Sequence, residues 1–245
     1  MGRIASVISG KGGTGKTTLT AGIASCLAAL SQRVLCIDAD VGLRNLDISL
    51  GMSEICSIPF SCVMRGENTL GDAAEHPEIP GLFLLTAPIG ETPESLDFAA
   101  FGAMLRDARE QFDWVLIDAP AGIGAGFRLA TAFSDLALVV SGGDPASLRD
   151  AARATDLLLA EKETEAFLIV NRVFARLYSK MHATIDDVMD AVGLPLLGIV
   201  PEDGDLTLAA AEQTAAILYS DHGASQAFLN IAKRLLGKRV PLMKL

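Results

Sequence analysis

The sequence predicts an α/β fold in which helices cover both faces of a doubly wound, mostly parallel sheet. Short apolar runs alternate with helical patterns along the whole chain, and the runs are continuously apolar, which is typical of strands buried on both faces. This repeated order of strand and helix predicts a parallel sheet. No linker, repeat or low-complexity tract divides the 245 residues, so we expect a single domain over residues 1–245.

Seven apolar runs bounded by turn residues are expected to form the strands. They are short and rich in β-branched residues or leucine, which suits a pleated, buried surface. In chain order, the expected strands are Ile4–Ser9, Val34–Asp38, Leu82–Thr86, Trp114–Asp118, Leu136–Ser141, Phe167–Asn171 and Leu196–Val200.

Five segments between these runs show helical spacing of their apolar residues. Asp or Ser stands near several of the starts, and Gly193 and Gly237 follow two of the ends, as helix termini favour. The irregular segment Ser53–Gly81 is expected to form only short helices and loop. The expected helices are Lys16–Leu30, Phe98–Gln111, Ala146–Glu161, Thr184–Val192 and Ser225–Leu236.

Composition and charge exclude several classes of protein. Half of the residues are hydrophobic and 20% are charged, which is too apolar for intrinsic disorder. The chain has 30 Asp and Glu and 20 Lys and Arg, which gives a net charge of −10. Because binding to a nucleic-acid backbone needs a basic surface, no nucleic acid is expected as a partner. No apolar stretch approaches the length of a membrane span, and no secretory signal is visible, so the cytoplasm is the expected location.

The cysteines and histidines form no ligand pattern. The four cysteines make no CxxC and have no nearby histidine, so neither a zinc site nor a disulfide framework is expected. We expect Cys26, Cys36, Cys56 and Cys62 to be small buried apolar residues. The histidines are scattered among residues that look exposed, and no role is assigned to His76, His182 and His222.

A glycine-rich loop follows the first expected strand directly and opens a helix. Its sequence, GKGGTGKT, fits the pattern G-x-x-x-x-G-K-[ST] in the setting that this pattern requires. Glycines let backbone N–H groups turn towards phosphate oxygens, and the helix start adds the positive end of its dipole. Lys16 is expected to neutralise phosphate charge, and Thr17 to bind Mg²⁺. The residues expected to hold nucleotide here are Gly10, Lys11, Gly12, Gly13, Thr14, Gly15, Lys16, Thr17 and Thr18.

The second lysine of this loop, Lys11, is not required by an ordinary phosphate loop. On its own it would be interpreted as a solvent-exposed side chain, but the string KGGTGKTT resembles the deviant Walker A ATPases of the MinD/ParA family. That resemblance implies a P-loop NTPase with ATP and Mg²⁺ as cofactors. It also implies an ATP-dependent homodimer in which Lys11 reaches the nucleotide of the other subunit, so Lys11 is expected to be catalytic together with Lys16.

Two carboxylates stand at the end of the second expected strand, where ligands of open α/β sheets bind. From spacing alone, one of Asp38 and Asp40 could cap the next helix while the other is solvated. The residues that follow, VGLRNLD over 41–47, resemble the first switch of MinD proteins. By that resemblance, Asp40 orients the attacking water and is catalytic, and Asp38 lies close to the Mg²⁺ as part of the metal site.

A third carboxylate, Asp118, ends another buried strand and precedes the turn Ala119–Gly122. This is the expected Walker B acid, which holds Mg²⁺ through water, and Gly122 is expected to bring a backbone N–H close to phosphate. The family usually continues with Ile and an acidic residue, whereas this chain has Ile123 and Gly124. That departure leaves the contacts of the second switch and the hydrolysis rate open.

Two further strand ends resemble the segments that hold adenine in MinD proteins. They are VNR, which contains Asn171 and Arg172, and IVPED, which contains Pro201, Glu202 and Asp203. An Asn amide can donate to and accept from the adenine edge at once. From spacing alone Asn171 would be a turn residue, and the resemblance favours the adenine contact.

The resemblance runs from Ile4 to about Leu242, and its most specific segments are KGGTGKTT, DADVGLRNLDI, DAPAG and GIVPED. It implies a dimerising switch ATPase that places the division septum, with a MinC-like division inhibitor and an ATPase activator as partners. The alternatives are a ParA-type partitioning ATPase, a flagellar-placement regulator, a scaffold with little turnover, or a metabolic P-loop enzyme. Asp144–Asp150 is interpreted equally as a partner contact or as an ordinary helix start.

The end of the chain bears on membrane attachment. MinD-type proteins attach through a C-terminal amphipathic helix, and residues 222–245 hold five cations and no acid. However, Gly237 and Pro241 interrupt any continuation, and the apolar stripe of the last expected helix is needed for packing. We therefore expect the membrane-targeting helix to be truncated or absent and lipid binding to be weak. The inner face of the cell membrane would be a second location only if the native chain carries this anchor.

Overall fold

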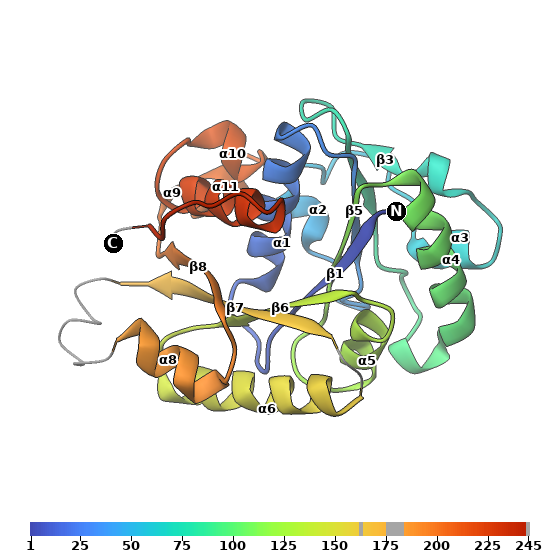
Figure 1. Cartoon of the computed structure of the whole chain (residues 1–245). Helices are drawn as coiled ribbons and strands as arrows, with labels where there is room; N and C mark the ends of the chain where they lie inside the picture. Colours follow the sequence, from blue (N-terminus) through green and yellow to red (C-terminus); the bar gives the residue numbers. More distant parts are fainter. Residues whose placement is uncertain (162–163, 175–183, 244–245) are drawn as a thin grey trace.

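The computed structural model describes residues 1–161, 164–174 and 184–243, and it confirms the predicted α/β architecture (Figure 1). The strands form one sheet in the order β3-β4-β2-β5-β1-β6-β7-β8. Every pairing is parallel except that of the short edge strand β3 with β4. The sheet therefore extends to both sides of β1, which lies next to β5 and β6.

All seven predicted strands are present. Three have the predicted bounds, and β7 extends further at both ends. β1 is shifted by one residue towards the N-terminus, and β4 and β8 each differ by one residue at one end. The two-residue strand β3 was not predicted. The strands are β1 (Arg3–Ile8), β2 (Val34–Asp38), β3 (Ala74–Glu75), β4 (Leu82–Leu85), β5 (Trp114–Asp118), β6 (Leu136–Ser141), β7 (Glu165–Val173) and β8 (Leu196–Pro201).

The five predicted helices are also present, and the structure adds several short ones. Two 3₁₀ turns, η1 (Leu70–Asp72) and η2 (Pro93–Ser95), lie in the less regular part of the chain. The α-helices are α1 (Lys16–Ala29), α2 (Leu46–Ser49), α3 (Phe60–Met64), α4 (Phe98–Gln111), α5 (Ala125–Thr131), α6 (Pro145–Glu161), α8 (Ile185–Val192), α9 (Asp205–Ala211), α10 (Ala216–Tyr219) and α11 (Gly223–Leu235).

Side chains alternate along the strands and divide the core into two layers. In β1, Ile4 and Ile8 pack into one cluster with α4, α5, α6 and α8, whereas Ala5 and Val7 pack into the other with α1 and α11. Figure 1 shows α1 and α11 on one side of the strands and α6 and α8 on the other. The sheet is thus covered on both faces, as its continuously apolar strands predict.

Helix α11 lies close against α1 and β8. A Cβ on Gly22 would come within 2.2 Å of the Phe228 ring, and one on Gly198 within 2.4 Å of Ile231. Phe228 and Ile231 are fully buried. The apolar stripe of the last helix therefore packs on the domain, as expected. Within the described residues, no helix is long and apolar enough to cross a membrane.

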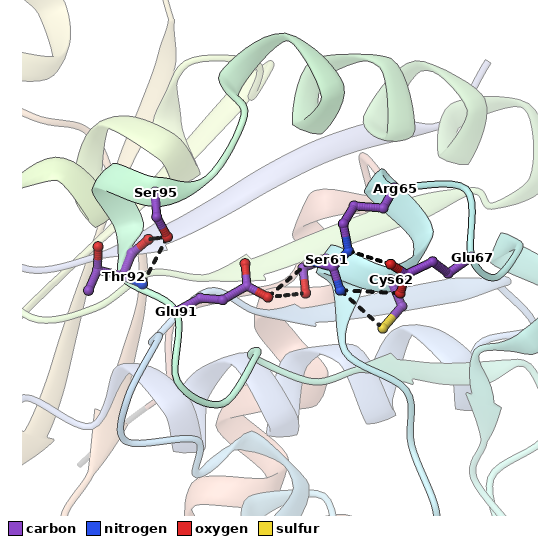
Figure 2. A network of polar contacts seen from close by, with 7 residues as sticks. All are labelled: Ser61, Cys62, Arg65, Glu67, Glu91, Thr92 and Ser95. Carbon is purple, nitrogen blue, oxygen red and sulfur yellow. Dashed lines mark hydrogen bonds and ion pairs between the residues drawn. The ribbon is translucent and has the colours of Figure 1, made fainter.

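A polar network fastens the segment around α3 to the loop that precedes η2 (Figure 2). Ser61 Oγ donates to Glu91 Oε1 at 2.9 Å, and Arg65 Nη1 donates to the same oxygen at 3.0 Å. Arg65 also pairs with Glu67 at 2.7 Å. These groups lie largely at the surface, where water and salt weaken ion pairs, so the network contributes little to stability.

The expectation of four buried cysteines is wrong for two of them. Cys26 and Cys36 are buried in α1 and β2, but Cys56 is exposed and Cys62 is partly exposed. The reason is their place in the chain, since Cys56 lies in an irregular surface loop and Cys62 on the short helix α3. The buried residues of α3 are Phe60 and Ser61, and Cys62 lies outside that buried part of the helix.

His76 is 4% exposed, contrary to its exposed appearance in the sequence. Its Nδ1 accepts hydrogen bonds from the backbone N–H groups of Glu78 and Ile79 at 3.0 and 3.1 Å, so Nε2 carries the proton and donates to Leu50 O at 2.9 Å. The ring joins the β3–β4 turn to the end of α2. Burial lowers the pKa of His76. His182 lies outside the described residues.

We predict that His76 makes folding stability depend on pH. Because its pKa is lowered in the folded chain, the stabilisation is complete above the unfolded pKa of about 6.5 and is lost as the pH falls below it. His76→Gln should lower the free energy of unfolding by about 1–3 kcal/mol at pH 8. Urea unfolding from pH 8 to pH 5 should show this difference shrinking. The exposed His222→Gln is the control, and a constant difference for His76→Gln would contradict the prediction.

Candidate nucleotide-binding site

The predicted phosphate loop connects β1 to α1 at the carboxyl edge of the sheet. Gly13 and Gly15 have φ angles of +78° and +85°, a backbone conformation that favours glycine. Gly15 is the N-cap of α1 and supplies no side-chain acceptor, and the first turn of α1 holds no acid. The first N–H groups of this helix are therefore available to an anion such as phosphate.

Two glycines of the loop are required by close packing. A Cβ on Gly10 would lie 2.2 Å from the backbone oxygen of Asp150 in α6, and one on Gly15 would lie 2.4 Å from Asn171 Nδ2. Gly12 differs, because its Cβ would meet no atom closer than 3.7 Å. The first glycine thus serves to bring α6 against the loop, a reason that the motif alone does not reveal.

Thr17 contacts the predicted Walker B acid, Asp118. Thr17 Oγ1 donates to Asp118 Oδ2 at 2.7 Å. Thr20, which the sequence analysis missed, donates to the other carboxylate oxygen at 3.1 Å. Asp118 is 1% exposed, and burial raises its pKa to about 7. Burial lowers the pKa of Lys16, while the charges of Asp118 and Asp40 oppose that change.

Asp38 lies beside Asp118 in the register of β2 and β5. One of its oxygens accepts the N–H groups of Asn45 and Leu46, both at 3.1 Å, and the other accepts that of Asp40 at 3.0 Å. Burial raises its pKa to about 6. The structure therefore shows the helix-capping role that the spacing had left open, since Asp38 holds the start of α2 and the loop before it.

Two further loops at this edge follow β2 and β5. Asp40 is half-buried, and burial raises its pKa while the charge of Lys16 lowers it. Gly122 has a φ of +87°, and no atom lies within 4 Å of the position of a Cβ. Gly124 is the N-cap of α5 and offers no side-chain acceptor. Neither glycine adds a side chain that would lie between the backbone and a ligand.

Lys11 lies against a carboxylate of its own chain. Its Nζ is 3.2 and 3.4 Å from the two oxygens of Asp144. Asp144 also accepts hydrogen bonds from the hydroxyl and the backbone N–H of Ser147, and the Ser147 hydroxyl is the main cause that lowers its pKa to about 2. Asp144 thus caps α6. This is the ordinary helix start that was one of the two interpretations of Asp144–Asp150. The partner contact of this segment stays a prediction.

A cavity of about 350 Å³ brings together the five residues predicted to hold adenine. Asn171 Nδ2 donates to Thr14 O at 2.8 Å, which leaves its second N–H and its Oδ1 for a ligand. The contribution of α9 to the lining of this cavity was not predicted from the sequence. The cavity is lined by Gly15, Thr18, Asn171, Arg172, Pro201, Glu202, Asp203, Leu206, Thr207 and Ala210.

The three charged residues predicted to hold adenine are already engaged within the chain. Arg172 makes a two-pronged ion pair with Glu202 at 2.7 and 3.0 Å. Asp203 accepts the N–H groups of Asp205 at 3.0 Å and Ala224 at 2.8 Å, so it caps the starts of α9 and α11. Asp203 therefore shapes the cavity by fixing two helices.

A metal cage made by the protein alone is absent, because the described residues contain no group of three or more His, Cys, Asp or Glu side chains that could hold an ion. Mg²⁺ does not require one, since it usually binds one or two protein oxygens together with phosphates and water. The adjacent oxygens of Thr17 and Asp118 are hard ligands beside the phosphate loop and fit such an ion.

Comparison with known proteins agrees with this geometry. The family model described as the CobQ/CobB/MinD/ParA nucleotide binding domain matches residues 5–216. The chain belongs to this family. Septum site-determining protein MinD of Synechocystis is 35% identical, with 99% of this chain and 92% of the relative covered. MinD of Bacillus subtilis is 34% identical, with 100% of this chain and 93% of the relative covered.

Solved structures of the family have the same fold. MinD in the MinC:MinD cell division protein complex of Aquifex aeolicus superposes with a TM-score of 0.91 at 32% identity, covering 99% of this chain and 98% of that one. MinD of Pyrococcus horikoshii in complex with Mg-ADP has a TM-score of 0.84 at 27% identity, with 96% of each chain covered. The sheet order and the phosphate loop thus belong to a nucleotide-binding family.

We predict that Gly10 and Gly12 respond differently to an added methyl group. Gly10→Ala should lower the free energy of unfolding by roughly 1–3 kcal/mol, because its Cβ would overlap the backbone of α6. Gly12→Ala should fold with nearly wild-type stability, since its Cβ has room. Urea unfolding curves of the two variants test this pair, and equal midpoints would refute the packing role of Gly10.

Proposed function

We propose that the chain is a Mg²⁺-dependent ATPase switch that dimerises around ATP and takes part in placing the division septum. The observation that carries the proposal is the contact of Thr17 with the buried Asp118, next to the uncapped start of α1. The MinD relatives at 34–35% identity over nearly the whole chain support the septum role. The adenine of ATP would occupy the cavity beside Asn171.

Each polar group at the carboxyl edge has a part in this proposal. The N–H groups of the loop and Lys16 hold the phosphates, and Thr17 and Asp118 hold Mg²⁺. When bound, Mg²⁺ offsets phosphate charge that the nearby carboxylates would otherwise repel. Asp40 orients the attacking water, and it lies close enough to Lys16 for each charge to affect the pKa of the other. Asp38 keeps the loop that carries Asp40 in place.

Dimerisation requires Lys11 to leave its place in the free chain. The ion pair with Asp144 is exposed to solvent, and exposed pairs of this kind contribute about 0–1 kcal/mol. The charge of a second subunit's nucleotide is a far stronger partner for an ammonium group in a closed interface. Lys11 would thus complete the site of the other subunit. A MinC-like inhibitor would bind the dimer, as the MinC:MinD complex of Aquifex aeolicus suggests, and an activator would stimulate hydrolysis.

We predict that two variants with slow ATP hydrolysis regain hydrolysis when they are mixed. Asp40→Ala should bind ATP and slow hydrolysis by about 10²–10⁴-fold, because the attacking water loses its orientation. Lys11→Ala should bind ATP and also hydrolyse slowly. A mixture should regain hydrolysis, since a mixed dimer has one site with its own Asp40 and the partner subunit's Lys11. Phosphate release under steady-state conditions measures the rate.

The double variant Lys11→Ala/Asp40→Ala provides the matched control for this experiment. Mixed with either single variant, it creates no complete site and should add no hydrolysis. A 1:1 mixture of the two single variants that hydrolyses ATP only at the sum of their separate rates would contradict the role of Lys11 across the dimer. Equal rates in Asp40→Ala and the wild type would contradict the role of Asp40.

A further inference from the structure

The carboxylate of Asp118 is held at both oxygens by hydroxyl groups of a single helix. Thr17 Oγ1 donates to Oδ2, and Thr20 Oγ1 lies 3.1 Å from Oδ1. Residues three apart lie on the same face of a helix, so both threonines reach β5 from α1. Thr20 is fully buried and stands outside the phosphate-loop motif, which ends before it. Its contact with Asp118 has no part in the roles assigned above.

The Thr20 hydroxyl has one proton and two acceptors. Lys16 O lies 3.0 Å from its oxygen, and Asp118 Oδ1 lies 3.1 Å from it. Lys16 O already accepts the helical N–H one turn later, as carbonyl groups in an α-helix do. A hydrogen bond to a carboxylate is roughly twice as strong as one between neutral groups. The proton is therefore best placed on the bond to Asp118.

Other buried threonines show what is particular to this one. Thr131 and Thr155 are also buried and also lie near the carbonyl oxygen one turn earlier, at 2.9 and 3.0 Å. Among the contacts of the described residues, their hydroxyl groups bond only to backbone carbonyl groups, whereas Thr20 also meets a buried carboxylate. Thr155, on α6, is thus a matched comparison for Thr20.

We propose that Thr20 is a positioning residue that fixes the plane of the Asp118 carboxylate for Mg²⁺ bound with nucleotide. The last torsion of an aspartate is broad, so one hydrogen bond leaves the carboxylate group able to rotate. Holding both oxygens fixes that torsion and directs the remaining lone pairs. This inference rests on the proposed nucleotide function, because it assigns a residue that acts through the Mg²⁺-binding acid.

The test measures how much Mg²⁺ strengthens ADP binding. The dissociation constant of a fluorescent ADP is determined with Mg²⁺ and again with EDTA. The value in EDTA is divided by the value with Mg²⁺, and this ratio is compared between variants. Thr20→Val keeps the shape and removes the donor. Thr20→Ser keeps the donor. Thr20→Cys leaves a small apolar residue with a weak donor and provides a second variant if valine prevents folding. Thr155→Val is the control.

We expect the ratio to fall by about 10-fold or more in Thr20→Val and Thr20→Cys, as is usual when a group that orients a metal ligand is lost. Thr20→Ser and Thr155→Val should keep the wild-type ratio, and affinities in EDTA should stay within about 2-fold in all variants. An unchanged ratio in Thr20→Val and Thr20→Cys would overturn the proposal, as would an equal loss of affinity in EDTA, which indicates a merely structural role. Failure of the wild type to bind ADP would instead refute the proposed function.

Discussion

The hydrogen bond between Thr17 and the buried Asp118 joins the start of α1 to the end of β5, and the candidate site depends on it. It places the phosphate loop directly over the carboxyl edge of the sheet. The loop can lie so close only because Gly10 lets α6 approach and Gly15 accommodates Asn171. This contact between a helix and a strand thus holds the phosphate loop next to the predicted metal-binding acid.

The charges at this edge are poorly balanced in the chain alone. Burial raises the pKa of Asp38 and Asp118 and lowers that of Lys16, which means that each charged form is disfavoured. Hydrogen bonds from the Thr17 hydroxyl and from the backbone around Asp40 and Leu46 offset part of this cost. Under the proposed function, phosphates and Mg²⁺ would bring the charges that complete the arrangement. A site of this kind is suited to a switch, because binding of nucleotide changes its electrostatic balance.

Much of this could be predicted from the sequence, because the decisive patterns are local. Continuously apolar runs identified β2, β5 and β6 to the residue, and the glycine-rich loop identified the start of α1. Family resemblance added the residues that are predicted to hold adenine, and the structure brings them to one cavity. The short helices α9 and α10 and the two-residue strand β3 lack a pattern of sufficient length, so only tertiary packing defines them.

The contacts that were not predicted share another cause. Thr20 meets Asp118 across 98 positions of the chain, and Lys11 meets Asp144 across 133. His76 looks exposed because its neighbours in sequence are polar, yet its ring fits between Leu50 and the turn at Ile79. Such contacts arise from the packing of distant segments, and no spacing in the sequence encodes them.

The proposed ATP-dependent dimer is tested most directly by the mass of the wild-type chain in solution, measured by light scattering with Mg²⁺ present throughout. The chain is measured with ADP and then with a non-hydrolysable ATP analogue at the same protein concentration. We expect a monomer with ADP and a doubled mass with the analogue, because Lys11 can then leave Asp144 for the nucleotide of a second subunit. The same mass in both states would contradict it.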